Sequence, residues 1–504
     1  MRTTEKPRGR RPVIPLALVC AALLLACCAS AYALNPELDV SQYAHTSWKI
    51  RDGFPKGEIS SLAQTPDGYL WIGTESGLFR FDGIRHVQWR PSGNQELPSH
   101  WIFSLLVSRD GTLWIGTAKG LASWKEGKLT QYAELAGRYI FKVLEDREGT
   151  VWVSGAAVPV GKLCAIRNSS VQCFGDDGSF GRAVFNLHED GKGNLWAGVK
   201  DGLWRWKPGP PKFFSLPDQP DGIQSFGEDK DGTLLIGWNG GIHRFVDGKT
   251  EVYPLAGNTR RFVAKRIIRD RDGALWIATE NGIVHVHNGK TDVFTGSEGL
   301  SGERINTLFE DRERNIWVGT MSGLDRFRDT TVATLSVNQG LSSPRIRSAV
   351  ADRNGGVWLT TPAGLNRWHN GQVTVLNVKR KSDGKLNAFS PNSIFQDHTG
   401  RLWVSTPSEF GYLDHDRFVS VSTVPGVITA IAQDTANALW IANEHAGLFQ
   451  IAGDKVVQQI PWSSLGHDDH ASAITADPKG GIWLGFFLGG VVYYSDGQVR
   501  ASYS

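Results

Sequence analysis

The stretch DGYLWIGTESGLFRF, residues Asp67–Phe81, recurs as DGTLWIGTAKGLASW at Asp110–Trp124. Related copies continue along the chain, and the tryptophan of the motif, or a leucine in its place, recurs every 37 to 45 residues. The marker positions are Trp71, Trp114, Trp152, Trp196, Leu235, Trp276, Trp317, Trp358, Trp403, Trp440 and Trp483. No helical periodicity separates the markers, and a repeat of this length is typical of the four-stranded sheets that form the blades of a β-propeller.

Each repeat contains the signals for short strands. An apolar stretch such as ISSLAQ predicts the first strand, LWIGT the second and GLFRF the third, with glycine-containing turns between them. A more variable fourth strand closes the unit. Both faces of the LWIGT strand are apolar, and its Gly73 leaves room for a side chain of a neighbouring sheet. Because one sheet cannot bury two apolar faces, the sequence predicts an all-β protein whose sheets stack around an axis.

The number of repeats predicts two rings. Eleven repeats exceed the roughly four to eight blades of one propeller. The segment His45–Ile59 resembles the pieces between repeats, such as ATLSVNQGLSSPRI, so we expect it to add an outer strand to the repeat around Trp317. This pairing predicts one complete seven-bladed ring over residues 45–328 and a partial second ring of about four blades (blades 8–11) over residues 329–504. We therefore expect the chain to be the front part of a longer protein or a truncated member of its family.

Residues 1–33 predict an export signal. A basic region ends at Arg11, an apolar run covers residues 13–25, and the small residues Ala31 and Ala33 form an A-x-A cleavage site. We expect cleavage after Ala33 and a periplasmic product. The alternative is a lipoprotein with Cys27 as the lipidated residue. Contact with the membrane is expected only through that lipid or through a C-terminal segment outside this sequence.

The charge of the chain argues against a nucleic-acid partner. The formal net charge is +3, and five basic residues lie in the export signal, so the remainder is close to neutral. The 58 glycines and 19 tryptophans fit many tight turns and a core filled by large rings.

Two cysteines follow the export signal, Cys164 and Cys173. If Asn168 and Ser169 form a two-residue hairpin loop, the cysteines face each other across two strands. A local disulfide is the prediction for an oxidising compartment, and two free thiols on a surface hairpin are the alternative.

Units such as DRERNIWVGTMSGLDRF (residues 311–327), preceded by EGLSGERIN, resemble two-component regulator propeller repeats, and the resemblance extends from His45 to the end. It implies the periplasmic sensor region of a large bacterial signal transducer. Such proteins combine two seven-bladed propellers, an immunoglobulin-like connector, a membrane span and a cytoplasmic histidine kinase or diguanylate cyclase. Many respond to oligosaccharides. The last three blades, the connector, the membrane span and the output domain have no counterpart in this sequence, so no enzymatic activity is expected of it.

Catalytic and metal-binding motifs are scarce in the sequence. It has no G-x-S-x-G elbow, H-E-x-x-H motif or phosphate-binding loop. In GHDDH (residues 466–470), His467, Asp469 and His470 could be metal ligands, but a polar loop is the preferred interpretation. The DKDG and DRDG sequences at 229–232 and 270–273 lack the downstream glutamate of a calcium loop and are interpreted as hairpin turns. We expect no metal and no cofactor.

Position in the repeat predicts a ligand-binding rim. Loops that lead into each first strand open on one rim of the central channel, and aromatic rings and guanidinium groups there suit the sugar faces and acidic groups of an oligosaccharide. The candidates are His100, Trp101, Arg138, Tyr139, Arg182, Arg260, Arg261, Arg304 and Arg345, with Trp462 in a later loop as a weaker one. In the alternative interpretation these are ordinary rim residues, and the two rings Trp101 and Tyr139 pack against neighbouring loops.

The leading hypothesis is therefore a binding module that senses an oligosaccharide or another small ligand without catalysis. The first alternative is an enzyme similar to streptogramin lyases, propellers that use a histidine and a metal. The second is a scaffold that docks protein partners. Homodimer formation is left open.

Overall fold

The computed structural model describes residues 34–503 except 36–37, 94, 157–159, 217–221, 239, 257–261, 330–333, 377, 381–389, 416, 422–423, 425–426 and 454. The predicted export signal, with Cys27 and Ala33, lies outside the described residues. The chain divides into unit 1 (Met1–Ala333) and unit 2 (Thr334–Ser504), which we describe separately. None of the described residues forms a helix with the length and apolar character of a membrane span.

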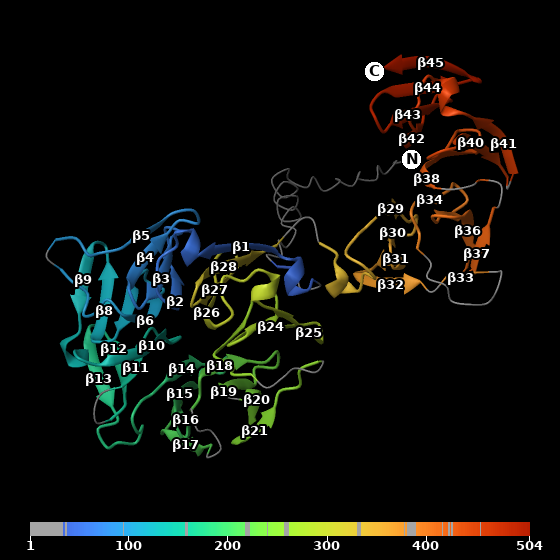
Figure 1. Ribbon diagram of the computed structural model, residues 1–504. Coiled ribbons are helices and arrows are strands. Elements are labelled where there is room, and N and C mark those ends of the chain that lie inside the picture. The colour runs from blue at the N-terminus through green and yellow to red at the C-terminus, as the bar shows by residue number, and fades with distance from the viewer. Residues whose placement is uncertain are drawn as a thin grey trace, which may run out of the picture. The chain divides into compact units, whose positions relative to one another are not determined.

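The described part of unit 1 consists of seven four-stranded antiparallel sheets and short 3-10 turns. Figure 1 shows these sheets around a common centre, with the first strand of each innermost and the last outermost. Sheets 1 to 3 are β2 (Ile59–Gln64), β3 (Leu70–Thr74), β4 (Gly77–Phe81) and β5 (His86–Gln88); β6 (Ile102–Val107), β7 (Leu113–Thr117), β8 (Gly120–Lys125) and β9 (Lys128–Gln131); and β10 (Tyr139–Glu145), β11 (Val151–Ala156), β12 (Lys162–Arg167) and β13 (Ser170–Phe174). Sheets 4 and 5 are β14 (Asn186–Glu189), β15 (Leu195–Val199), β16 (Gly202–Lys207) and β17 (Lys212–Ser215); and β18 (Ser225–Glu228), β19 (Leu234–Trp238), β20 (Gly241–Val246) and β21 (Lys249–Val252). Sheets 6 and 7 are β22 (Arg266–Arg269), β23 (Leu275–Thr279), β24 (Gly282–His287) and β25 (Lys290–Phe294); and β26 (Ile305–Glu310), β27 (Ile316–Thr320), β28 (Gly323–Arg328) and β1 (Ala44–Lys49).

The outer strand of sheet 7 comes from the other end of unit 1. Strand β1 pairs antiparallel with β28 over six residue pairs, from Ala44 opposite Arg328 to Lys49 opposite Gly323. This pairing is the one predicted from the sequence of the segment that begins at His45. The ring of Trp48 stacks on Trp317 with centroids 5.6 Å apart. The N-terminal strand therefore completes the sheet that follows it by more than 250 residues.

The glycine of LWIGT sets the spacing between sheets. A Cβ atom added to Gly73 would lie 2.7 Å from Cγ2 of Ile102 in sheet 2, and one added to Gly319 in sheet 7 would lie 2.6 Å from Cγ2 of Ile59 in sheet 1. The innermost strands β2, β6, β10, β14, β18, β22 and β26 contact one another in this order, and β26 contacts β2. Glycine at this position therefore allows close packing of sheets 1, 2, 4, 5 and 7 against their neighbours, as the sequence predicted for Gly73, whereas sheets 3 and 6 have Ser154 and Ala278 there.

A polar residue six positions before the tryptophan holds the turn between the first two strands. In sheet 7, Asp311 is buried, its Oδ2 accepts a hydrogen bond from Nε1 of Trp317 at 2.6 Å, and its Oδ1 accepts one from the backbone N–H of Asn315 at 2.8 Å. The equivalent pairs are Asp146–Trp152, Asp190–Trp196, Asp270–Trp276, Asp397–Trp403, Asp434–Trp440 and Asp477–Trp483, with Thr65–Trp71 and Ser108–Trp114 using hydroxyl groups. The buried indole N–H and the turn thus share one acceptor.

We expect Asp311→Ala to lower the free energy of unfolding of unit 1 by about 2–3 kcal/mol, because it leaves a buried indole N–H and turn amides without an acceptor. Thermal unfolding of the purified protein, followed by calorimetry, measures the effect. Asp311→Asn retains an acceptor oxygen and is the matched control, with a smaller loss. Equal losses for the two variants would show that the carboxylate, rather than the shared acceptor, stabilises the turn.

The hairpin β12–β13 contains Cys164 and Cys173. Asn168 and Ser169 form a two-residue loop with φ of 46° and 64°, and Cys164 lies directly opposite Cys173. The structure joins them in a disulfide. The left-handed φ values are those of the turn that matches the strand twist, so the predicted loop brings the sulfur atoms together.

The described part of unit 2 contains four sheets of the same pattern. They are β29 (Ser348–Ala351), β30 (Val357–Thr361), β31 (Gly364–His369) and β32 (Gln372–Leu376); β34 (Ile394–Gln396), β35 (Leu402–Ser405), β36 (Phe410–Asp414) and β37 (Arg417–Ser420), to which β33 (Lys379–Arg380) adds in parallel; β38 (Ile428–Gln433), β39 (Leu439–Asn443), β40 (Gly447–Ala452) and β41 (Lys455–Ile460); and β42 (Ala471–Ala476), β43 (Ile482–Phe486), β44 (Val491–Ser495) and β45 (Gln498–Tyr503). The innermost strands β29, β34, β38 and β42 contact one another in sequence. The all-β prediction is therefore confirmed for the residues that the structure describes.

Candidate functional site

Residues at or near the start of the innermost strand of every sheet in unit 1 surround one cavity of about 160 Å³, and they form two sets. The first set, ring A, is Ser60, Phe103, Phe141, Phe185, Gln224, Lys265 and Asn306. The second set, ring B, is Ser61, Ser104, Lys142, Asn186, Ser225, Arg266 and Thr307, of which Ser225 alone does not line the cavity. Since every sheet contributes at the same point of its repeat, this cavity lies on the axis around which the seven sheets are arranged.

Bulges in the innermost strands place ring A residues at the axis. The pairing register shifts between Ile59 and Ser61 in β2, and the same shift occurs in β6, β10 and β26. The residue skipped by the shift is Ser60, Phe103, Phe141 or Asn306, all members of ring A. A bulge bends a strand and redirects a side chain, which explains how two successive residues can both face the cavity.

The rings carry positive charge without acidic residues. Lys142, Lys265 and Arg266 are half-buried members, and the other members are uncharged. Within the described residues, neither Lys142 nor Arg266 forms an ion pair, and Nε of Arg266 and Nδ2 of Asn306 are buried without a hydrogen-bond partner. Lys142 and Arg266 also line two adjoining cavities of about 350 and 330 Å³. The axis is therefore a place where an anionic group would meet unpaired donors.

The pKa values reflect the same crowding of positive charge. Burial lowers the pKa of Lys142 well below its usual range, and the charge of Arg266 lowers it further. Burial also lowers the pKa of Arg266. For Lys265, burial and then the charge of Arg304 lower the pKa. A bound anion would oppose these shifts because it favours the charged form of each group.

Aromatic rings cover one side of this cavity. Phe103 lies 5.0 Å from Trp101 and 6.1 Å from Tyr139, and Phe141 lies 5.7 Å from Phe103 and 6.0 Å from Phe185 (centroid distances). We call these five residues of sheets 2 to 4 the aromatic strip. Trp101, Tyr139 and Phe185 are 43%, 46% and 38% exposed, respectively. A contiguous exposed strip of rings beside unpaired cations presents stacking surfaces and charge to the same ligand.

The structure brings together part of the rim predicted from sequence. Trp101 and Tyr139 belong to the aromatic strip, and Arg304 lies close enough to act electrostatically on Lys265. Arg138 is half-buried and Arg182 is exposed, and neither lines the axial cavity. His100 lines a separate cavity of about 770 Å³, Arg345 lies in unit 2, and Arg260 and Arg261 lie outside the described residues. The sequence analysis did not predict Phe103, Phe141, Phe185, Lys142 and Arg266 as site residues. Each belongs to the dipeptide that follows the apolar residue at the start of its repeat, and this position could have identified them.

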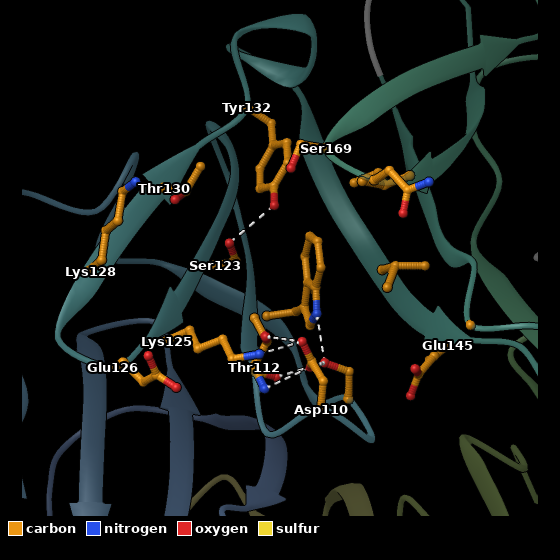
Figure 2. A pocket seen from close by; sticks show the side chains of 16 residues that line it. Asp110, Thr112, Ser123, Lys125, Glu126, Lys128, Thr130, Tyr132, Glu145 and Ser169 are labelled. Carbon is orange, nitrogen blue, oxygen red and sulfur yellow. Dashed lines mark hydrogen bonds and ion pairs between the residues drawn. The ribbon is translucent and has the colours of Figure 1, made fainter.

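A larger cavity between sheets 2 and 3, about 550 Å³, is a weaker candidate. Figure 2 shows that its polar side chains point toward one another: Lys125 Nζ lies 2.7 Å from Asp110 Oδ2, and Ser123 Oγ lies 3.1 Å from the Tyr132 hydroxyl. The hydrogen bond from Lys125 helps to hold the pKa of Asp110 below its usual range although burial raises it. These groups already satisfy one another, whereas those at the axis do not.

The remaining sequence candidates have structural explanations. In unit 2, His467 stacks on Phe486 at 3.6 Å and lies 3.4 Å from Asp469, whereas His470 stacks on Phe487. Trp462 is buried and donates a hydrogen bond to the carbonyl of Asn443, so it is a core residue rather than a rim residue. The turns at 229–232 and 270–273 join first and second strands, as predicted.

Comparisons with known proteins identify the repeats. Three segments, residues 53–76, 96–119 and 299–322, match the two component regulator propeller model. No curated protein matches the sequence. The extracellular domain of a putative hybrid two component system from B. thetaiotaomicron has a TM-score of 0.67 at 21% identity, covering 92% of this chain and 67% of that chain. The extracellular domain of a putative one component system from the same organism has a TM-score of 0.49 at 19% identity, covering 90% of this chain and 66% of that chain. Virginiamycin B lyase from Staphylococcus aureus has a TM-score of 0.46 at 13% identity, covering 57% of this chain and 100% of that chain.

The fold is thus that of a β-propeller protein, similar to extracellular domains of two component systems. The chain carries two component regulator propeller repeats, which confirms the resemblance noted in its sequence. It spans about two thirds of the length of these extracellular domains.

Proposed function

We propose that the chain is the periplasmic sensing region of a bacterial signal transducer and that it binds an acidic oligosaccharide without converting it. In this proposal the seven sheets of unit 1 are a complete seven-bladed propeller over residues 45–328, and residues 329–504 belong to a second ring. Kinase or cyclase output would reside in another domain. Export, with cleavage of residues 1–33, is part of the proposal.

The observation that carries the proposal is that rings of the aromatic strip and the unpaired cations line the same cavity. Phe103, Phe141 and Phe185 belong both to the strip and to the lining of the axial cavity that contains Lys142 and Arg266. A sugar ring stacked on the strip would bring a carboxylate or sulfate substituent toward these cations. The combination suits an acidic saccharide better than a neutral one, because a neutral ligand would leave the two charges uncompensated.

Titration calorimetry with defined acidic and neutral oligosaccharides tests the proposal. We expect acidic members to bind and Phe141→Ala to weaken them about tenfold or more, because the ring is at the centre of the strip. Phe213→Ala is the matched control, since Phe213 is 40% exposed on the outer strand β17. Absence of binding by any acidic saccharide, an equal loss in the control, or turnover of the bound saccharide would contradict the proposal.

A further inference from the structure

A buried cluster of two histidines and an aspartate lies in the β24–β25 hairpin of sheet 6. His285 and His287 are two residues apart on β24 and so project from the same face of the sheet. Asp292 on β25 is directly opposite His285. Both imidazoles are almost fully buried, and one potential ligand atom from each of the three residues lies within 4.8 Å of the other two.

The N-terminal segment brings a second carboxylate to this cluster. Asp39 precedes the 3-10 turn η1 (Val40–Gln42), and the backbone N–H of Val40 donates a hydrogen bond to Asp292 Oδ2 at 2.5 Å. Oδ1 of Asp39 then lies 3.4 Å from Nε2 of His287. The cluster therefore combines two residues of one strand, one of the next strand and one from a segment almost 250 residues away.

Three separations between potential ligand atoms in the cluster are close to those of a tetrahedral metal site. Asp292 Oδ1 lies 3.0 Å from His285 Nδ1 and 3.1 Å from His287 Nε2. Ligand atoms at the usual zinc distance of about 2.0–2.1 Å are about 3.3 Å apart in a tetrahedron. The measured separations of 3.0, 3.1 and 3.4 Å require only small adjustments to meet this value.

The charges also favour a cation. Nε2 of His287 faces two carboxylates, those of Asp39 and Asp292, although a ring nitrogen carries at most one proton. Two carboxylates thus converge on two buried imidazoles, a donor set of nitrogen and oxygen that zinc prefers.

We propose that His285, His287, Asp292 and Asp39 bind a structural zinc ion. Four protein ligands leave no open position for a substrate, so the ion stabilises rather than catalyses. It fastens the segment that leads into β1 onto sheet 6, next to the sheet that β1 completes. The site is distinct from the GHDDH loop, and it differs from the expectation that the chain holds no metal.

Metal analysis of the purified exported protein, after dialysis against a weak chelator, tests the proposal. We expect about one zinc per chain and, after removal of zinc, a tetrahedral visible spectrum on addition of Co²⁺. His287→Ala should abolish binding. Asp39→Asn, a change at a half-buried position outside the core, should weaken zinc at least tenfold while the fold is retained.

The control variant is His467→Ala combined with His470→Ala, which alters the other histidine pair in a loop of unit 2 and should keep the zinc. Zinc that is lost in this control but retained in Asp39→Asn would overturn the assignment. So would a folded wild-type protein that neither carries zinc nor gives the tetrahedral cobalt spectrum. Because Asp39→Asn leaves both histidines in place, a folding defect in His287→Ala does not prevent a decision.

Discussion

A chain that begins at Ile50, and therefore lacks β1, is expected to lose the cooperative unfolding transition of unit 1. Strand β1 covers the edge of β28 over six residue pairs, and its loss would expose that edge to solvent. It would also remove Trp48, whose ring contacts Phe81 of sheet 1 at 5.2 Å and Trp317 of sheet 7 at 5.6 Å. Since this tryptophan packs against the first and the last sheet, we expect a loss of several kcal/mol rather than a local effect. Calorimetry and limited proteolysis of the truncated chain measure it.

The same experiment has an internal control. A synthetic peptide of residues 34–52 added in trans should restore protease resistance to the truncated chain, because it supplies the missing strand. Trp48→Ala in the full chain keeps the strand and removes the ring, so we expect an intermediate loss of about 3 kcal/mol or more. A truncated chain with the unfolding midpoint of the full chain would show that β1 does not hold sheets 1 and 7 together.

Most of the fold could be predicted from the repeat, because each feature that recurs from repeat to repeat has a structural role within its own sheet or against the next one. The apolar LWIGT strand is buried on both faces, and its glycine lies against the next sheet, so pattern and packing agree. The pairing of β1 with β28 followed from a similarity between two segments of the same chain. The shared acceptor of Asp311 was not predicted, since its two partners come together only when the turn closes.

The candidate site was only partly predictable, for a geometric reason. The sequence predicted ligand-binding residues in the loops before each first strand, and Trp101 and Tyr139 were among them. The bulge places the next residues, such as Phe103 and Phe141, at the axis, and a shift of one residue in register cannot be read from an alternating pattern. Lys142 and Arg266 lie on opposite strands of the circle, β10 and β22, and only the closed arrangement places them together.

A similar reason applies to the proposed zinc site. The His-x-His spacing at residues 285–287 was present in the sequence, but alternation in a strand gives the same pattern without a ligand. The decisive partner, Asp39, comes from the segment before β1 and approaches sheet 6 only in the folded chain.

The axial cations imply a conflict between binding and stability. Two positive charges without acidic partners cost folding free energy, and a protein selected for stability alone would replace them by apolar or paired residues. A ligand that supplies the opposite charge would offset the folding free energy that these two cations cost. Removal of one cation should therefore move stability and binding in opposite directions.

Lys142→Met is expected to raise the free energy of unfolding of unit 1 by about 1–2 kcal/mol at neutral pH and to abolish the preference for acidic over neutral saccharides. Burial and the charge of Arg266 lower the pKa of Lys142, so the unfolded chain holds this proton more tightly than the folded one. Wild-type stability consequently rises as the pH increases from the folded pKa toward the unfolded pKa of about 10.4, and the advantage of the variant shrinks over the same interval.

Unfolding midpoints of the two proteins at about pH 6 and about pH 10 measure this difference, and titration with one acidic and one neutral saccharide measures the preference. Lys128→Met is the matched control, because Lys128 is an exposed lysine on the outer strand β9 and should change neither quantity. A variant that is less stable than the wild type at low pH would mean that Lys142 has a stabilising partner in the folded protein. A variant that is more stable but keeps the full preference for acidic saccharides would separate the buried charge from ligand recognition and assign that recognition to Arg266 or to the rim arginines.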